Sequence, residues 1–196
     1  MQTTIDQPGA HVRIVGGKFS GRNLATPSDQ AIRPTTDRTR ESLFNILASR
    51  KDHFWDGMRV LDLFAGTGAL GIEALSRGAR ACTFVEQSVE GRGLIHKNIE
   101  NFGLQGIARI LRRDATHLGQ VGTMQPFDIV FADPPYNHGL GEQAFIAAVE
   151  GGWINPNALF VLEESQEATI HLPEIFKLDD KRHYGGTIIY IYILQS

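Results

Sequence analysis

From residue 59 onward, the sequence alternates between short apolar segments and longer amphipathic ones. The stretch VLDLFAGTGALGIEAL (60–75) is one such unit, in which an apolar run passes through a glycine-rich turn into a helical pattern. Alternating strands and helices predict a parallel sheet covered on both faces, because each strand returns to the same edge through a helix. We therefore expect a doubly wound α/β domain.

The expected elements follow from apolar periodicity and from residues that begin or end helices. Strands are expected over 59–64, 81–86, 107–111, 127–131 and 159–163. Helices are expected over 37–49, 70–77, 88–101 and 141–150. Glycine pairs flanked by apolar segments predict an antiparallel C-terminal hairpin over 177–194 and a small N-terminal hairpin over 12–24.

The N-terminal part differs from the rest in composition and charge. Residues 1–10 are expected to be a disordered leader, and residues 25–36 a loop rich in Pro, Ser and Thr. Residues 11–50 hold seven Arg or Lys against three Asp or Glu, a net charge of +4, whereas the whole chain carries −3. A basic segment on an acidic body can present an anion-binding face. We divide the chain into an N-terminal extension (1–36) and a main domain (37–196).

Several classes of protein are excluded by simple counts. Cys82 is the single cysteine, which excludes a disulfide framework and a Cys-based zinc site. The seven histidines show no ligand spacing, so no metal is expected. Neither a signal peptide nor an apolar run long enough to span a bilayer is apparent, so we expect a cytoplasmic protein without a membrane partner.

The glycine-rich turn at 66–71 has the spacing G-x-G-x-x-G, which lets the backbone approach a ligand. The spacing is weak evidence alone, because a tight structural turn uses the same residues. Three acids strengthen it: Asp62 lies in the first expected strand, Glu86 ends the second and Asp114 follows the third. Parallel strands end at one edge, so these acids mark a nucleoside site, with Glu86 for the ribose hydroxyls and Asp114 for an adenine amino group.

The same loop indicates which nucleoside cofactor would fit. No Lys or Arg lies between Asp62 and Glu73, so the loop offers no cation to a diphosphate. S-adenosylmethionine (SAM) has a ribose and an adenine but no phosphates, and its ammonium group would suit Asp62. We predict that the cofactor-binding residues are Asp62, Phe64, Gly66, Thr67, Gly68, Glu86, Asp114 and Ala115.

A second motif, ADPPYNHG (132–139), follows an apolar strand. Its prolines stop the strand and stiffen the turn. An exocyclic base amine is a poor nucleophile because its lone pair is delocalised, and acceptors for its N–H bonds can localise that pair. We predict three catalytic residues: the Asp133 carboxylate and the Pro134 carbonyl as acceptors, and Tyr136 as a stacking face for the base. Because the ring face does the stacking, phenylalanine at 136 should serve nearly as well. A rigid loop with Asp133 as a helix cap is the structural alternative.

These motifs together resemble a known enzyme family. LDLFAGTGALG, Glu86, Asp114 and DPPY resemble class I SAM-dependent methyltransferases that methylate amines, and the block VRIVGGKFSGRNLATP…RPTTDRTRESLFNIL resembles the RsmD family of bacterial 16S rRNA guanine-N2 methyltransferases. The resemblance covers residues 12–192. It implies a Rossmann-like fold with seven strands, SAM as cofactor, and methylation of one guanine of 16S rRNA on the assembled 30S subunit, and we expect a monomer.

Such an enzyme must also hold RNA phosphates, which requires basic side chains but no particular sequence. The candidates in the basic N-terminal part are Arg13, Lys18, Arg22, Arg33 and Arg38. We expect the first four of these to form the main phosphate-holding face beside the Asp133 turn. Lys181 and Arg182 in the C-terminal hairpin are the alternative.

Three other functions stay open. DNA adenine-N6 methyltransferases use the same turn, although they usually carry a sizeable target-recognition region for which this chain has no room. A nicotinamide-dependent reductase would use the glycine loop and leave the turn at 133–136 unexplained. A non-catalytic RNA-binding protein would not need intact Asp133 and Tyr136.

Overall fold

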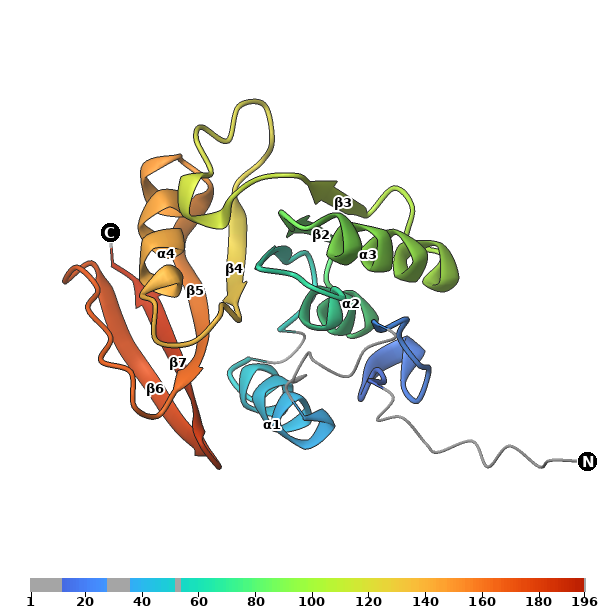
Figure 1. Cartoon of the computed structure of the whole chain (residues 1–196), viewed down its shortest axis with the longest axis horizontal. Coiled ribbons are helices and arrows are strands. Elements are labelled where there is room, and N and C mark those ends of the chain that lie inside the picture. The colour runs from blue at the N-terminus through green and yellow to red at the C-terminus, as the bar shows by residue number, and fades with distance from the viewer. Residues whose placement is uncertain (1–11, 28–35, 52–53, 196) are drawn as a thin grey trace, which may run out of the picture.

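The computed structural model describes residues 12–27, 36–51 and 54–195. The expected leader at 1–10 and Arg33 lie outside these ranges. Within them, seven strands form one sheet (Figure 1): β1 (Arg59–Leu63), β2 (Ala81–Val85), β3 (Ala108–Leu111), β4 (Phe127–Ala132), β5 (Ile154–Ser165), β6 (Phe176–Tyr184) and β7 (Thr187–Leu194). The helices are α1 (Asp37–Ala48), α2 (Ala69–Ser76), α3 (Val89–Phe102) and α4 (Leu140–Glu150), with short 3₁₀ turns η1 (Gly17–Phe19) and η2 (Ala115–His117).

The strand order is β3-β2-β1-β4-β5-β7-β6. The first five strands in this order pair in parallel, whereas β7 pairs antiparallel with both β5 and β6. The chain therefore winds outward in both directions from β1 and ends in an antiparallel hairpin on the same sheet. This confirms the predicted doubly wound, mostly parallel fold.

Helices cover both faces of the sheet (Figure 1). One apolar core joins α1, α2 and α3 to the sheet, and the other joins α4 and η2. Alternation along β4 supplies both cores, since Ile129 and Phe131 face the first while Val130 and Ala132 face the second. Phe131 contacts Phe44 of α1 with ring centroids 5.6 Å apart. Near-continuous apolarity in the central strands is therefore a consequence of burial on both sides.

The expected elements of the main domain agree with the observed ones to within one residue at each end, except for the strand expected at 159–163. The observed β5 begins at Ile154 and ends at Ser165. Its first part contains the exposed Pro156 and Asn157, and its pairing with β4 is irregular there. This part of the strand carries no apolar alternation that would reveal it.

The N-terminal segment 12–25 shares the core of the main domain. It forms a small antiparallel bridge between Arg13 and Asn23, as expected of a hairpin. Ile14 is fully buried and belongs to the same apolar core as α1, α2 and α3. The Val15 amide donates to the Glu73 carboxylate of α2 at 2.8 Å. A deletion in this segment would therefore remove part of the core, so the role of its basic residues is best tested by point substitutions.

A buried ion network fastens this segment to α1 and α2. Arg40 of α1 and Glu73 of α2 are almost completely buried. The Arg40 guanidinium donates to the Arg13 carbonyl and pairs with Asp37 at 2.8 Å, while its Nε lies 3.9 Å from Glu73. Buried charges are tolerated only when they are paired and hydrogen-bonded. The network therefore fixes the start of α1 relative to α2.

Asp62 is a buried acid in β1 that holds the first turn of α2. Its Oδ2 accepts the Gly71 amide at 2.9 Å. A side chain at Gly71 would meet the Phe84 ring at 2.4 Å and the Cys82 Sγ at 2.5 Å, so only glycine lets α2 pack this closely. Burial raises the pKa of Asp62 to about 8, although the Gly71 amide lowers it, and the Glu86 charge adds to the rise. At neutral pH the carboxyl group therefore stays largely protonated.

The raised pKa predicts a pH-dependent stability. The ordinary pKa is 3.8 and the folded pKa is about 8, so the contribution of Asp62 is fully present below about pH 4 and is lost as the pH rises through about 8. We expect Asp62→Asn, which stays neutral, to remove this loss. Between about pH 5 and 8, the free energy of unfolding of the wild type should fall relative to the variant by up to about 1.4 kcal/mol per pH unit.

Urea unfolding at several pH values across that window measures the difference. Glu90→Gln, at an exposed acid of α3, is the matched control and should leave the wild-type pH dependence unchanged. Parallel stability curves for the wild type and Asp62→Asn would show that the carboxyl group titrates normally.

Candidate functional site

A cleft of about 410 Å³ opens where β1 to β4 end. It is lined by Phe64, Val85, Glu86, Gln87, Ser88, Arg113, Asp114, Ala115, Asp133 and Pro135. Val85 is the last residue of β2, and the other lining residues belong to the segments that follow β1, β2, β3 and β4. The order of the strands reverses between β1 and β4, and in open α/β sheets ligands bind at such a switch point.

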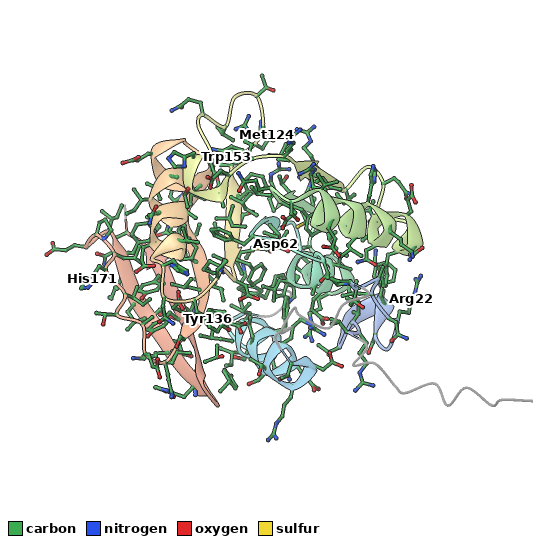
Figure 2. All side chains as sticks on the ribbon, viewed as in Figure 1. Arg22, Asp62, Met124, Tyr136, Trp153 and His171 are labelled. Atoms are coloured by element: carbon green, nitrogen blue, oxygen red, sulfur yellow. The ribbon has the colours of Figure 1, made fainter. Side chains whose placement is uncertain are left out.

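The cleft brings together two sets of predicted residues that are far apart in sequence. Phe64, Glu86, Asp114 and Ala115 from the cofactor prediction line it together with Asp133 from the catalytic prediction. The remaining cofactor candidates are not among the residues that line the cleft: Asp62 lies in β1, and Gly66, Thr67 and Gly68 lie in the turn between β1 and α2. Figure 2 shows Asp62 near the centre of the molecule.

Glu86 connects the two loops that form one side of the cleft. Its Oε2 accepts the Gly66 amide at 2.8 Å, and its Oε1 accepts the Ser88 amide at 2.7 Å. A Cβ at Gly91 would lie 2.7 Å from the Glu86 carboxyl carbon, so this turn of α3 requires glycine. A carboxylate offers about four acceptor sites. Glu86 can therefore hold both loops and still accept from two ligand hydroxyls.

The loop after β1 has a strained backbone. Phe64 has φ 58°, in the left-handed region that bulky residues rarely adopt. The turn is closed by the Gly68 amide, which donates to the Ala65 carbonyl at 2.7 Å. From α3, the buried Asn98 side chain donates to the Thr67 carbonyl at 2.9 Å. Such strain persists where surrounding contacts impose it, and it clusters at ligand-binding sites.

Asp114 lines the cleft from the segment after β3 and is the N-cap of η2. Its Oδ1 accepts the Thr116 amide at 2.9 Å and the Thr116 hydroxyl at 2.7 Å. These hydrogen bonds lower the pKa of Asp114, with His117 contributing further. The side chain is 41% exposed, so an ionised acceptor remains accessible from the cleft.

The turn after β4 is fixed by its neighbours. Pro134 is buried and Pro135 is exposed at the cleft. The Tyr136 hydroxyl donates to Glu163 Oε1 of β5 at 2.8 Å. The N-cap of α4 is Gly139 with φ 62°, so Asp133 is not the cap of the following helix. The alternative expectation that Asp133 serves only as the cap of the next helix is therefore wrong.

Several site residues were missed by the sequence analysis. Val85, Gln87, Arg113 and Pro135 line the cleft, but each is an ordinary residue next to a predicted one. Ser88, expected only as a helix cap, is the N-cap of α3 and also lines the cleft. The acids of β5 that hold the turn had one visible signal, because two glutamates directly follow the apolar run at 158–162.

The structure spreads the basic candidates over the N-terminal segment and α1. Arg13 is exposed and pairs with Asp37 at 2.8 Å, and Lys18 lies over the Phe19 ring.

Arg22 donates to the Asn101 carbonyl at 2.6 Å and stacks on Phe102 of α3. Arg38 is exposed on α1. Figure 2 shows Arg22 at the right-hand edge of the molecule and Tyr136 well separated from it, left of centre, so Arg22 does not lie beside the Asp133 turn.

Two further kinds of feature are absent from the described residues. No three His, Cys, Asp or Glu side chains in the ranges 12–27, 36–51 and 54–195 are grouped so that they can hold a metal ion. In the same ranges, none of the helices is both long and apolar enough to cross a membrane.

Comparisons with known proteins agree with this geometry. The model of the family described as "Conserved hypothetical protein 95" matches residues 12–193. "Ribosomal RNA small subunit methyltransferase D" of Escherichia coli (strain K12) is 41% identical over 157 residues, 80% of this chain and 76% of that protein. The protein of the same name from Haemophilus influenzae is 35% identical over 185 residues, 92% of this chain and 94% of that one.

Among solved structures, "Putative methyltransferase yhhF from Escherichia coli" is similar to this chain with a TM-score of 0.80 at 33% identity, covering 94% of this chain and 98% of that one. The matches extend over nearly the whole chain and confirm a Rossmann-like methyltransferase fold. The chain therefore belongs to the Conserved hypothetical protein 95 family, which is the RsmD family that its motifs resemble.

Proposed function

We propose that this protein transfers a methyl group from SAM to the exocyclic N2 amine of a guanine in 16S rRNA, on the assembled 30S subunit. One observation carries the proposal. Glu86 and Asp114, the two acids predicted to bind the cofactor, line the same cleft as Asp133, which is predicted to hold the amine. The names of the relatives, ribosomal RNA small subunit methyltransferase D, support an rRNA substrate. Because the chain belongs to a methyltransferase family, the hypothesis of a nicotinamide-dependent reductase is dropped.

The charges in the cleft fit SAM better than a dinucleotide. Three acids line it, whereas Arg113 is its single basic lining residue among those described. The Arg113 guanidinium donates to the Leu118 carbonyl at 2.5 Å and stacks over the Trp153 ring, so it is engaged outside the cleft. When bound, SAM supplies a methyl group on a positively charged sulfur. Glu86 would hold its ribose and Asp114 its adenine amino group.

The turn after β4 would activate the amine. The Asp133 carboxylate and the Pro134 carbonyl would each accept a hydrogen bond from one N–H group of the amine, which localises the nitrogen lone pair toward the methyl group. An amine that gains a methyl group must lose one proton, and the Asp133 carboxylate would accept it. The face of Tyr136 would support the extruded base.

Methyl transfer from labelled SAM followed by nucleoside analysis tests the proposal. The substrates are 30S subunits, protein-free 16S rRNA and double-stranded DNA. We expect N2-methylguanosine from the subunits and little label in DNA. N6-methyladenine from DNA would support the DNA methyltransferase instead, and absence of transfer to every substrate would contradict the proposed function.

Asp133→Ala should separate chemistry from cofactor binding. We expect SAM affinity to stay nearly intact while turnover falls by about two to three orders of magnitude, the loss typical of one polarising hydrogen-bond partner. Single-turnover methyl transfer and a SAM titration measure the two effects. His138→Ala, at an exposed position of the same turn, is the control. Near wild-type turnover in Asp133→Ala would remove Asp133 from the reaction.

We further propose that the basic residues of the N-terminal part hold the RNA backbone. Arg22 supports α3 and is left unchanged, so the test variant combines Lys18→Gln, Arg33→Gln and Arg38→Gln. Each lost phosphate contact should flatten the salt dependence of RNA binding by about 0.7 log units per log unit of salt. Lys181→Gln with Arg182→Gln is the comparison, and a flatter slope only there would place the RNA on the C-terminal hairpin.

A further inference from the structure

Two adjacent glutamates at the end of β5 bind the turn that follows β4. Glu163 is 8% exposed and Glu164 is 1% exposed. Consecutive residues of a strand point to opposite faces, so the two carboxylates leave β5 in different directions. A buried carboxylate is costly unless it accepts hydrogen bonds. Neither acid lines the cleft, so cofactor binding does not explain them.

Glu163 holds the ring of Tyr136 through its hydroxyl. The hydroxyl donates to Glu163 Oε1 at 2.8 Å and lies 3.4 Å from the Thr187 hydroxyl of β7. Burial raises the pKa of Tyr136, with the charges of Glu163 and Asp133 adding to the rise against the Thr187 hydrogen bond. The hydroxyl therefore stays protonated and remains a donor. Because the hydroxyl oxygen lies on the long axis of the ring, this hydrogen bond fixes the direction of that axis.

Glu164 holds the backbone directly after this ring. Its Oε1 accepts the Asn137 amide at 3.0 Å and the Ser165 amide at 2.7 Å. Asn137 has φ 64°, a left-handed conformation that is uncommon outside glycine. Asparagine is among the non-glycine residues that adopt this conformation most readily, and the hydrogen bond from β5 holds the bend in place. The hydroxyl of Tyr136 and the backbone amide that follows this residue are therefore both hydrogen-bonded to β5.

We propose that Glu163 and Glu164 are positioning residues for methyl transfer. Glu163 fixes the direction of the long axis of the Tyr136 ring and Glu164 fixes the backbone that carries the ring, so that a base stacked on the ring meets the methyl donor in a reactive orientation. This inference rests on the proposed function. A displacement of about 1 Å can lower a rate about a hundredfold, so the anchors bear directly on turnover. The contact also revises the expectation that phenylalanine at 136 serves nearly as well.

The test compares kcat, KM for 30S subunits and SAM affinity in a set of variants. Glu163→Ala should lower kcat by about tenfold or more while both binding parameters stay within about twofold. Glu163→Gln keeps an acceptor oxygen and should restore most of kcat. Tyr136→Phe should lose as much as Glu163→Ala, and the double variant should be no worse than either, because both remove one shared hydrogen bond. Glu167→Ala, at an exposed glutamate nearby, is the control.

Wild-type kcat in Glu163→Ala, or losses that multiply in the double variant, would overturn the proposal while leaving the proposed function intact. If the wild type transfers no methyl group, the proposed function fails, and hydrogen exchange still tests the anchor. In that case the Asn137 amide should exchange about tenfold faster in Glu164→Ala and near the wild-type rate in Glu164→Gln. Unchanged exchange in Glu164→Ala would overturn the anchoring itself.

Discussion

The Glu86 carboxylate is the contact on which the site depends most. It accepts the Gly66 amide from the loop after β1 and the Ser88 amide from the loop after β2. Without this acceptor, two amides at the edge of a cleft would lose their partners, which costs more than the hydrogen bonds contribute. Its position explains why Gly91 has no side chain, and its charge adds to the effect of burial, which is the main cause of the raised pKa of Asp62. The Glu86 side chain therefore both holds the two loops that shape the cleft and supplies part of its negative charge.

The sequence predicted the fold well because each element carries its own local signal. Apolar periodicity marks the strands and helices, and Ser88 and Gly103 bound α3 as expected. The acids of the cleft were predictable for a geometric reason, since parallel strands end at one edge. The contacts of Glu163 were not, because they depend on where β5 and β7 lie relative to the turn. Likewise, Arg22 is directed to α3 by tertiary contacts that no local pattern reports.

The basic N-terminal part combines two roles in the proposed enzyme. Ile14 and the amide of Val15 belong to the core and to the Glu73 network, whereas Lys18 is exposed. Residues proposed to hold RNA therefore sit on a segment whose other side stabilises α1 and α2. The turn after β4 is similarly divided, since its cleft side carries Asp133 and its other contacts reach β5. A preorganised site requires segments that are held rigidly on one side and present accessible polar groups on the other.

The most direct test of the account is SAM binding by Glu86 variants, measured calorimetrically. If Glu86 holds the ribose as well as the two loops, Glu86→Ala should weaken binding by about 1–3 kcal/mol, the range for hydrogen bonds to a charged group. Glu86→Gln, which keeps one acceptor oxygen, should lose less, and Glu90→Ala on the exposed side of α3 should bind like the wild type. Unchanged affinity in Glu86→Ala, with the fold intact, would contradict the assignment of this cleft to the cofactor.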